Sequence, residues 1–450
     1  MRRSAIIDAL RSCMRGVVLD AQGDREPYGY DYGAHCRAMP LVVVRPVSEQ
    51  DVVHTLQVAR AYGVSVSVRG GGHACGGQPL CRDGIVIVNA TDDEDIIVGD
   101  DSRVEVSART TWAALERVLN AHGRSTPVLT NNLQSTVGGT LAVGGFGPRS
   151  ITHGAQIDHV ERLRLIQPDG TAIWCSPADE PELFRFTLAG LGQIGVIERV
   201  VMRTTPHRPL LRLQTNEYRS RAEAIDAIAW TADWTEESPD HFFVHVEGGA
   251  GHCTSNFATA FEQRDDAIFT PVPTPLRAMQ GATVRMARRP PVMSEARDLR
   301  YRSFWSDYCF DLDGLRAFGR FVDAAYADGR LPANPSNDFL YCLRRPAAEA
   351  PCPFDIRSIG GSGRNVYGFG LHYRVERDDE ERAAACRSAL RMALATCVEL
   401  GGRPYLYGWN ELDEHTRRQL YGHDYDRLLE LRRRVDPNNL LNPNALIGAC

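Results

Sequence analysis

The sequence predicts an α+β fold in which helices and strands are mixed with antiparallel hairpins. Short strand-like stretches alternate with helical segments up to about residue 205, and longer, aromatic-rich strands follow. The dipeptide Asp169-Gly170 separates Leu163–Ile166 from Thr171–Trp174, which is a strong hairpin signal. Hairpins among the helices favour an α+β fold over a doubly wound parallel sheet.

The 450 residues are too many for a single hydrophobic core, and about two or three domains are expected. The character of the chain changes twice, which divides it into residues 1–205, 206–402 and 403–450. Its composition is that of an ordinary globular protein, with 43% hydrophobic and 24% charged residues. The formal net charge of -6 gives no reason to expect nucleic acid or an anionic membrane as a partner.

No run of about 18 apolar residues occurs, so no segment is expected to span a membrane. The first residues are too charged for a signal peptide and predict a short amphipathic helix. The 12 cysteines show neither a C-x-x-C pair nor a zinc-binding spacing, so we expect reduced thiols, no metal and a cytoplasmic location. The basic cluster Arg432–Arg434 predicts a solvated helix face. We expect a monomer or a homodimer.

In the first region, Ser48 is a good helix N-cap, with Asp51 three residues later and apolar residues at helical spacing after it. Residues 65–68 alternate polar and apolar side chains, as in a half-buried strand, and lead into a glycine-rich loop. Strands at 84–89 and 103–107 and a helix at 111–121 follow.

The second region contains predicted strands at 241–247 and 366–373 and a Pro- and Arg-rich stretch, 271–292, that predicts a long loop. Its last helix, at about 380–400, is capped by Gly401-Gly402. The third region carries a helix at about 424–435 and then two proline turns. These turns predict that the last segment of the chain packs against the rest of the fold.

Residues 69–78 read Arg69-Gly-Gly-Gly-His73-Ala-Cys-Gly-Gly-Gln78. Consecutive glycines after a strand remove every Cβ, so backbone N–H groups can approach an anion such as a pyrophosphate. A histidine that closes this turn is a nucleophile beside a bound cofactor. Neither the G-x-G-x-x-G fingerprint nor the Walker pattern fits. The alternative is an ordinary glycine turn with a surface histidine.

Two further glycine clusters occur at 136–147 and 190–197. Turns alone do not require small residues at all of these places. The clusters favour a long, flat, phosphate-bearing ligand that is lined by backbone from separate parts of one domain.

With these motifs the chain resembles the FAD-linked oxidoreductases of the vanillyl-alcohol oxidase, or PCMH-type FAD-binding, superfamily. It is most similar to cytokinin dehydrogenases and more loosely to berberine-bridge-type oxidases. The resemblance covers nearly all of the first and third regions, and the middle region matches only in general pattern. It rests on residues 69–78, 136–141, 153–157, 190–195, 405–406, 436–437 and 441–443.

The resemblance implies a two-part FAD-binding domain, formed by residues 1–205 and 403–450. Residues 206–402 would form a substrate domain, an antiparallel sheet that is flanked by helices and covers the flavin ring. The resemblance also implies that FAD is linked covalently through His73. The implied cofactor-binding residues are Val68, Gly70, Gly71, Gly72, His73, Ala74, Gln78, Asn131, Thr136, Gly138, Gly139, Ala142, Phe146, Ile197, Tyr405 and Asn442.

Three positions depart from the pattern of these relatives. Cytokinin dehydrogenases carry an aspartate where this chain has Asn131, and an amide cannot act as a general base, although it can orient a substrate. Doubly linked relatives carry a cysteine at the position of Gln134, so a second flavin bond is not expected. Ala74 replaces a common serine.

Flavin oxidation removes a hydride from a C–H group next to O or N, so the site needs a polar group that accepts a proton. The candidate catalytic residues are Glu247, His372 and Tyr407, with Asn131 orienting the substrate. An outward-facing position is the alternative for Glu247, because alternate strand residues face opposite ways. A structural histidine is the alternative for His372.

We therefore expect an FAD-dependent oxidase or dehydrogenase that oxidises a small organic substrate at a C–N or C–O bond. Dioxygen or another acceptor would reoxidise the flavin. The alternatives are an NAD(P)H-dependent reductase of a C=C bond and a catalytically silent flavin-binding protein. The arginine-rich composition suggests a bacterial gene, with a role in secondary metabolism.

Overall fold

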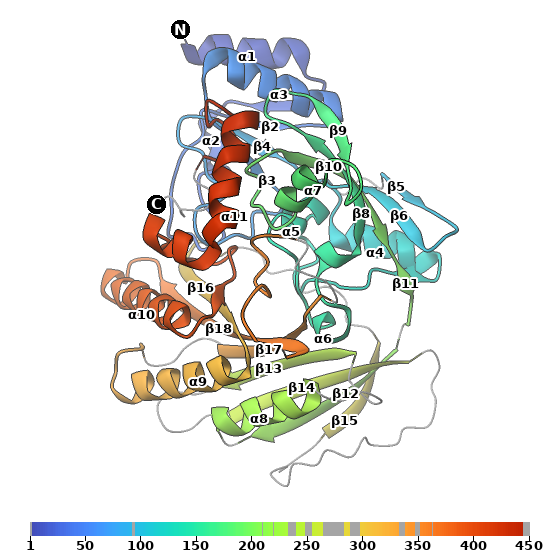
Figure 1. Cartoon of the computed structure of the whole chain (residues 1–450). Coiled ribbons are helices and arrows are strands. Elements are labelled where there is room, and N and C mark those ends of the chain that lie inside the picture. The colour runs from blue at the N-terminus through green and yellow to red at the C-terminus, as the bar shows by residue number, and fades with distance from the viewer. Residues whose placement is uncertain are drawn as a thin grey trace.

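The strands assemble into four sheets in the computed structural model (Figure 1), which describes residues 2–91, 95–208, 210–218, 220–232, 240–247, 254–263, 283–288, 298–332, 338–346, 352–361 and 363–443. Within these residues the strand orders are β1-β2-β4-β3, β5-β6-β10-β8-β9, β11-β7 and β15-β12-β14-β13-β17-β18-β16-β19. Parallel pairs are confined to the first sheet, and helices cover the sheets, so the predicted α+β fold class is confirmed.

The first sheet carries the strand that leads into the glycine-rich loop. Its strands are β1 (Val17–Leu19), β2 (Val42–Arg45), β4 (Ile85–Val88) and β3 (Val66–Arg69). The neighbouring helices are α1 (Arg2–Cys13), α2 (Gln22–Arg25), η1 (Glu26–Tyr28) and α3 (Glu49–Tyr62). Apolar side chains of α1 and α3 bury this sheet. The Asp51 N–H donates to Ser48 Oγ, which confirms the predicted N-cap.

The second sheet is antiparallel and contains the predicted hairpin. Its strands are β5 (Ile96–Val98), β6 (Arg103–Ser107), β10 (Val196–Arg203), β8 (Val160–Ile166) and β9 (Ala172–Cys175). The hairpin between β8 and β9 closes with the Gln167 N–H donating to the Thr171 carbonyl at 2.8 Å. The surrounding elements are α4 (Trp112–Ala121), β7 (Arg124–Ser125), α5 (Val137–Leu141), α6 (Ser150–His153), η2 (Gln156–His159), α7 (Pro181–Thr187) and β11 (Thr205–Pro206).

The large sheet is antiparallel throughout its described pairs. Its strands are β12 (Leu210–Tyr218), β13 (His241–Glu247), β14 (Thr254–Gln263), β15 (Thr283–Arg288), β16 (Tyr301–Phe310), β17 (Asp338–Arg344), β18 (Asn365–Glu376) and β19 (Arg403–Pro404). The helices α8 (Arg221–Ala232), α9 (Leu312–Ala327) and α10 (Glu380–Glu399) pack against it. β15 lies within the stretch 271–292, so the predicted loop is wrong for these residues, and the rest of that stretch lies outside the described residues.

Successive residues of a strand point to opposite faces of its sheet. In β16, Phe304, Tyr308 and Phe310 are buried in the core that includes α9 and α10. Trp305 and Asp307 lie on the other face and line a cavity. One face of the large sheet is therefore core, and the opposite face is available for a ligand.

The C-terminal helix α11 (Glu414–Val435) returns to the first sheet, where the red helix lies beside the blue N-terminal elements (Figure 1). It begins about ten residues before the predicted start, because a kink at Gly422 joins two helical segments. Arg432 is buried and donates to the Gln193 carbonyl, so the predicted solvated face is wrong for this residue. After the helix, the Val66 N–H donates to the Leu440 carbonyl at 2.8 Å.

The division of the chain at residues 205 and 402 stays a prediction, and β19 joins the large sheet although it follows residue 402. The smaller sheets use strands that end by Pro206, and the large sheet uses strands from Leu210 to Pro404.

Among the described helices, none combines the length and apolar character that crossing a membrane requires. Nine described cysteines are free, whereas Cys36 is disulfide-bonded, so the expectation of reduced thiols is wrong for that residue.

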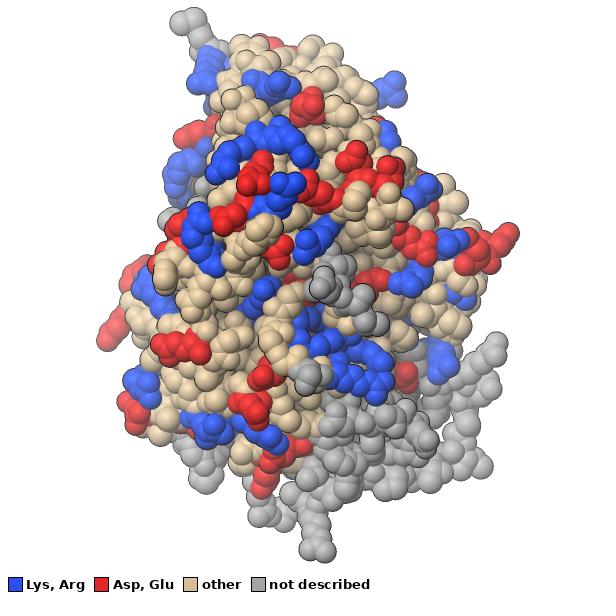
Figure 2. Space-filling model, in the orientation of Figure 1, with Lys and Arg blue, Asp and Glu red and all other residues tan. Residues whose placement is uncertain are grey.

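Acidic and basic side chains are interspersed over the upper part of the face that Figure 2 shows. Ion pairs between partly exposed side chains include Arg391 with Glu411 at 2.5 Å and Arg434 with Glu182 at 3.0 Å. Exposed pairs of this kind contribute about 0–1 kcal/mol each to stability. The buried core and the buried ion pairs of Arg357 contribute more to the stability of the fold.

Candidate functional site

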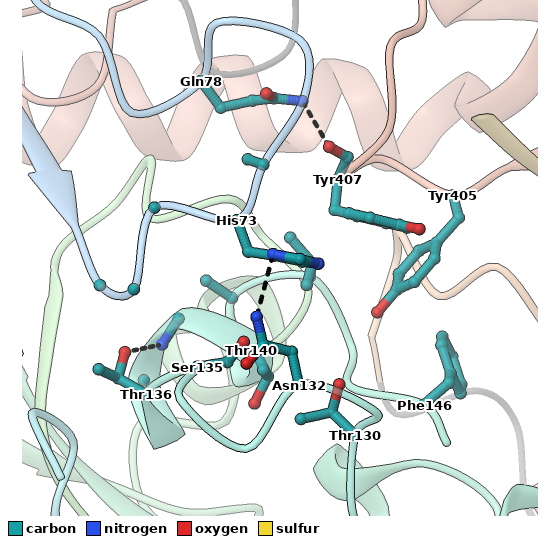
Figure 3. Close-up of a pocket in the computed structure, with 18 of the residues that line it drawn as sticks. His73, Gln78, Thr130, Asn132, Ser135, Thr136, Thr140, Phe146, Tyr405 and Tyr407 are labelled. Atoms are coloured by element: carbon teal, nitrogen blue, oxygen red, sulfur yellow. Dashed lines mark hydrogen bonds between the residues drawn. The ribbon is translucent and has the colours of Figure 1, made fainter. Parts of the chain in front are cut away.

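A cavity of about 600 Å³ lies between the glycine-rich loops and the free face of the large sheet (Figure 3). Every residue predicted to bind the cofactor lines it: Val68, Gly70, Gly71, Gly72, His73, Ala74, Gln78, Asn131, Thr136, Gly138, Gly139, Ala142, Phe146, Ile197, Tyr405 and Asn442. The candidate catalytic residues His372 and Tyr407 line it too. Residues far apart in the sequence thus meet around one space.

Two of the glycine loops form a wall of bare backbone. Gly70 is so close to Thr136 that a Cβ would overlap the threonine hydroxyl, and a Cβ on Gly71 would lie 2.9 Å from the Gln134 carbonyl oxygen. Gly72 has a φ of +73°, which L side chains rarely adopt. Thr136 caps α5, its Oγ1 accepting the Gly139 N–H at 3.2 Å. Both loops therefore require glycine where they approach each other.

The C-terminal segment closes a third side of the cavity. Asn442 Oδ1 accepts the Val68 N–H at 2.9 Å, and its Nδ2 donates to the Gly192 carbonyl at 2.7 Å. The same side chain therefore joins β3 to the cluster 190–197. On the opposite side, Gln78 Nε2 donates to the Leu406 carbonyl at 2.8 Å and ties the first glycine loop to the C-terminal region.

His73 stands in the cavity, near Asn132 and Tyr407 (Figure 3). Its Nδ1 lies 3.2 Å from Asn132 Nδ2, and its ring centroid lies 4.1 Å from that of Tyr32. The segment that contains Tyr32 packs behind the glycine loop, where Asp31 Oδ2 accepts the Gly77 N–H at 2.9 Å. The N-terminal segment thus supports the loop that carries the histidine.

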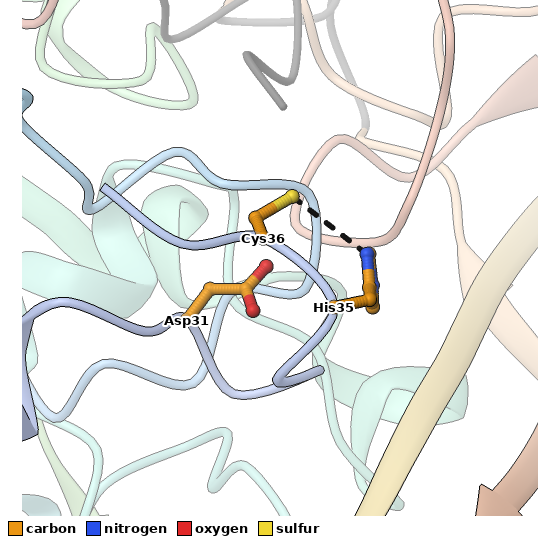
Figure 4. A group of neighbouring side chains, drawn as sticks. All are labelled: Asp31, His35 and Cys36. Atoms are coloured by element: carbon orange, nitrogen blue, oxygen red, sulfur yellow. Dashed lines mark hydrogen bonds between the residues drawn. The ribbon is translucent and has the colours of Figure 1, made fainter. Parts of the chain in front are cut away.

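Asp31, His35 and Cys36 form a group of possible metal ligands behind this loop (Figure 4). Their ligand atoms lie within 4.8 Å of one another. Cys36 is disulfide-bonded, however, and Asp31 accepts a backbone N–H, so the group is explained as a support for the loop. Burial raises the pKa of Asp31 to about 7 and lowers the pKa of His35 to about 3.

Asp307 is a buried carboxylate on the sheet side of the cavity. Trp305 Nε1 donates to its Oδ1 at 2.7 Å, and the Tyr407 hydroxyl donates to its Oδ2 at 3.2 Å. Burial raises the pKa of Asp307 to about 7, and the hydrogen bonds from Trp305 and Tyr407 offset part of that effect. A carboxyl group with this pKa changes charge near neutral pH and can exchange a proton through Tyr407.

Aromatic rings form the rest of the sheet wall. Trp305 stacks on His372 with centroids 4.6 Å apart, and Phe339 stacks on Tyr341 at 5.8 Å. The glycines 368 and 370 of β18 make room for these rings, because a Cβ at either position would overlap Tyr341 or Phe339. The wall therefore combines flat aromatic surfaces with the hydrogen-bonded pair of Asp307 and Tyr407.

The structure brings together all but one of the predicted catalytic residues. Asn131, His372 and Tyr407 line the cavity, whereas the side chain of Glu247, at the end of β13, lies outside the described residues. Sequence reasoning did not identify Asp307 or Asn132. An acidic residue between Trp305 and Tyr308, in the aromatic-rich strand Tyr301–Phe310, is a signal that could have identified Asp307.

Comparison with known proteins places two family models on the chain. Residues 40–176 match a model described as an FAD binding domain, and residues 407–447 match one described as berberine and berberine like. The first match contains two of the glycine loops and His73, and the second contains Tyr407 and Asn442.

Among curated relatives, an uncharacterized oxidoreductase of the fasciation locus of Rhodococcoides fascians is 32% identical over 221 residues, 49% of this chain and 49% of that protein. Cytokinin dehydrogenase 8 of Oryza sativa subsp. indica is 36% identical over 186 residues, 38% of this chain and 35% of that protein. The matched segments thus span about half or less of these relatives.

Solved structures resemble the chain over nearly its whole length. Chitooligosaccharide oxidase has a TM-score of 0.73 at 14% identity and covers 99% of this chain and 100% of its own. The BBE-like 1 protein of Physcomitrella patens has a TM-score of 0.75 at 13% identity and covers 99% of both chains. At these identities the likeness shows the fold, which is the one predicted.

Proposed function

We propose that this chain, a member of the PCMH-type FAD-linked oxidoreductases, oxidises a small organic molecule at a C–O or C–N bond with FAD bound in the cavity. The family matches cover the glycine loops and the C-terminal segment that line that cavity. The observation that carries the proposed reaction is the buried pair of Asp307 and Tyr407, which lies opposite these loops.

The walls of the cavity fit a flavin dinucleotide. Gly70, Gly71 and Gly72 present backbone without Cβ atoms, which suits the close approach of a pyrophosphate. Asn442, Gly192 and Ile197 line the same cavity, and Asn442 is hydrogen-bonded to Gly192. His73 offers an imidazole for covalent attachment, and we propose that FAD is linked there. When bound, FAD supplies a two-electron acceptor for the hydride of the substrate.

Residues of the protein would accept the proton that the substrate loses. The Tyr407 hydroxyl would accept the proton of a substrate O–H or N–H group while it gives its own proton to Asp307 Oδ2, 3.2 Å away. Trp305 holds Asp307 Oδ1 through its indole N–H and so fixes the carboxylate. The stacked rings of Trp305 and His372 would present a flat surface to the substrate. Asn131 would orient the substrate through its amide.

This arrangement favours oxidation over a silent flavin-binding role, because a carboxyl group whose pKa is shifted toward neutrality and that lines a cavity is typical of catalytic sites. The electron acceptor that restores the flavin would be dioxygen or another small oxidant. The cytokinin dehydrogenases among the relatives and the chitooligosaccharide oxidase among the structures act, by their names, on different compounds. We therefore propose the type of bond that is oxidised, C–O or C–N, and name no substrate.

The test is anaerobic mixing of the purified protein with a panel of primary alcohols, secondary alcohols and amines, followed by the flavin absorbance. We expect at least one alcohol or amine to bleach the flavin and NADPH to leave it oxidised. Rapid bleaching by NADPH, with no response to any member of the panel, would instead indicate the reductase.

A further inference from the structure

We propose that Asn132 is a positioning residue for flavin attachment, which holds Nδ1 of His73 without a proton and turns the imidazole toward the cavity. The inference rests on the proposed attachment of FAD through His73 and adds the residue that prepares this histidine. It concerns the direct contact between Asn132 Nδ2 and His73 Nδ1, 3.2 Å apart.

The orientation of the Asn132 amide follows from its second hydrogen bond. The Gln134 N–H donates to Asn132 Oδ1 at 3.0 Å, and a backbone N–H can only be a donor. The amide oxygen is therefore engaged, and the NH₂ group is the end that faces His73. An amide NH₂ can only donate, so Nδ1 accepts and carries no proton. The Ser135 N–H donates to the Asn132 carbonyl at 3.1 Å and fixes the same turn.

The imidazole is also held from its other side. The Tyr32 ring packs at a centroid distance of 4.1 Å and an interplanar angle of 50°. Tyr32, Asn132 and His73 line a second cavity of about 280 Å³, so His73 lines both cavities. The other charged or titratable groups around the imidazole include Arg69, which lines the second cavity, Cys75 of the same loop and Tyr407 of the C-terminal region.

Attachment needs a free electron pair on the nitrogen that forms the new bond to the 8α carbon of the flavin. In the tautomer that Asn132 favours, this nitrogen is Nδ1, and the hydrogen bond from Asn132 is given up as the new bond forms. One hydrogen leaves the 8α methyl group and one leaves the imidazole as the N–C bond forms. Together these are two protons, one of them from Nε2, and two electrons, and they pass to dioxygen, which is reduced to hydrogen peroxide. An imidazolium has no free pair, so a neighbour that disfavours protonation at Nδ1 promotes this step.

The test compares Asn132→Asp and Asn132→Ala with the unchanged protein, and uses Gln134→Ala as the matched control. Asn132→Asp keeps an oxygen for the Gln134 N–H but replaces the donor to His73 with a carboxylate. Gln134→Ala keeps the backbone N–H and removes an exposed side chain of the same turn. The covalent fraction is the flavin that stays with acid-precipitated protein, divided by the total flavin.

The unchanged protein and each variant are then produced with limiting riboflavin, so that most chains lack flavin, and are incubated with FAD in air at a series of pH values. We expect attachment in both Asn132 variants to slow by about 10- to 100-fold at neutral pH, while Gln134→Ala matches the unchanged protein. In Asn132→Asp the carboxylate favours the imidazolium, so the pH midpoint of attachment should rise by about one unit or more.

Complete attachment in both Asn132 variants, or equal pH midpoints for the two, would overturn the proposal. So would a failure of both variants to bind any FAD, because the role of Asn132 would then be structural. Absence of covalent flavin in the unchanged protein would refute the proposed attachment itself, which separates that failure from a failure confined to the Asn132 variants.

Discussion

Among single side chains, Asp307 has the surroundings that the proposed chemistry needs. It is buried, it accepts hydrogen bonds from Trp305 and Tyr407, and burial raises its pKa to about 7. Such a carboxylate is ionised at slightly alkaline pH and still basic enough to take a proton. Tyr407 connects it to the cavity.

Asp307→Asn should therefore impair the reaction and leave the cofactor in place. The amide cannot accept a proton, so the rate of flavin reduction by a substrate should fall by about 10²–10⁴-fold. The measurement is anaerobic stopped-flow absorbance, with Asp313→Asn as the control, because the Asp313 side chain is 95% exposed on α9. Equal reduction rates for Asp307→Asn and the unchanged protein would exclude Asp307 as the proton acceptor.

The pH dependence of flavin reduction follows from the same pKa. Below about pH 7 Asp307 holds a proton and cannot accept another, so the rate should rise as pH increases through about 7. Asp307→Asn should lose this rise and keep a low, flat profile. A profile of the unchanged protein that is flat between about pH 5.5 and 8.5 would contradict the assignment.

Sequence motifs could predict the residues that line the loop side of the cavity but not Asp307. The glycines, His73, Gln78 and Asn442 lie in motifs whose residue types follow from backbone approach to a dinucleotide. Asp307 lies on a strand of the middle region, where alternation shows that residues face opposite ways but does not show which face is core. The packing of α9 and α10 against one face of the large sheet decides which face is core.

Among the elements, the two glycine loops have the strictest requirements. Gly71→Ala should place a Cβ 2.9 Å from the Gln134 carbonyl oxygen, which forces the loops apart where the dinucleotide would lie. We expect the purified variant to contain less than half of the flavin per chain of the unchanged protein, judged from its visible spectrum. Gly23→Ala, whose Cβ meets nothing within 4 Å, is the control and should keep its flavin.

A full flavin content in Gly71→Ala would mean that the loops can separate without loss of flavin binding.

Local sequence signals predict most of the helices and strands, because caps, hairpin turns and strand alternation act over a few residues. Ser48, Asp169-Gly170 and the alternation in β18 are examples. The sequence does not predict the start of α11, because Gly422 interrupts the helical pattern. It does not predict β15, because prolines surround this strand in the sequence.

At the level of the whole molecule, Arg357 joins the two parts that enclose the cavity. Its guanidinium is fully buried and contacts Asp158 Oδ2 and Asp355 Oδ2, each at 2.6 Å. Asp158 belongs to η2 near the second sheet, whereas Asp355 and the Arg344 carbonyl, 3.1 Å from Nη1, belong to the part with the large sheet. The ion pair therefore fixes one part against the other.

Arg357→Met should destabilise the protein, because it leaves two buried or half-buried carboxylates without their partner. We expect the free energy of unfolding to fall by about 3–5 kcal/mol, measured by denaturant unfolding. Arg391→Ala, which removes an exposed pair with Glu411, should change it by no more than about 1 kcal/mol. Similar values for the two variants would show that the junction does not depend on Arg357.

The way in which the parts come together could not be predicted from local patterns. The pairing of β13 with β17, and the contact of the C-terminal segment with Val66, join residues far apart in the chain. Such contacts depend on the complete fold. The resemblance to known proteins implied the return of residues 403–450 to the first region, and the Val66 N–H donates to the Leu440 carbonyl.

The central claim, that the cavity holds FAD on His73, is tested most directly by acid precipitation of the purified protein and of His73→Ala. We predict that the unchanged protein is yellow and that its colour stays with the precipitate. His73→Ala should release its flavin into the supernatant. A colourless purified protein, or a colourless precipitate from the unchanged protein, would contradict the account.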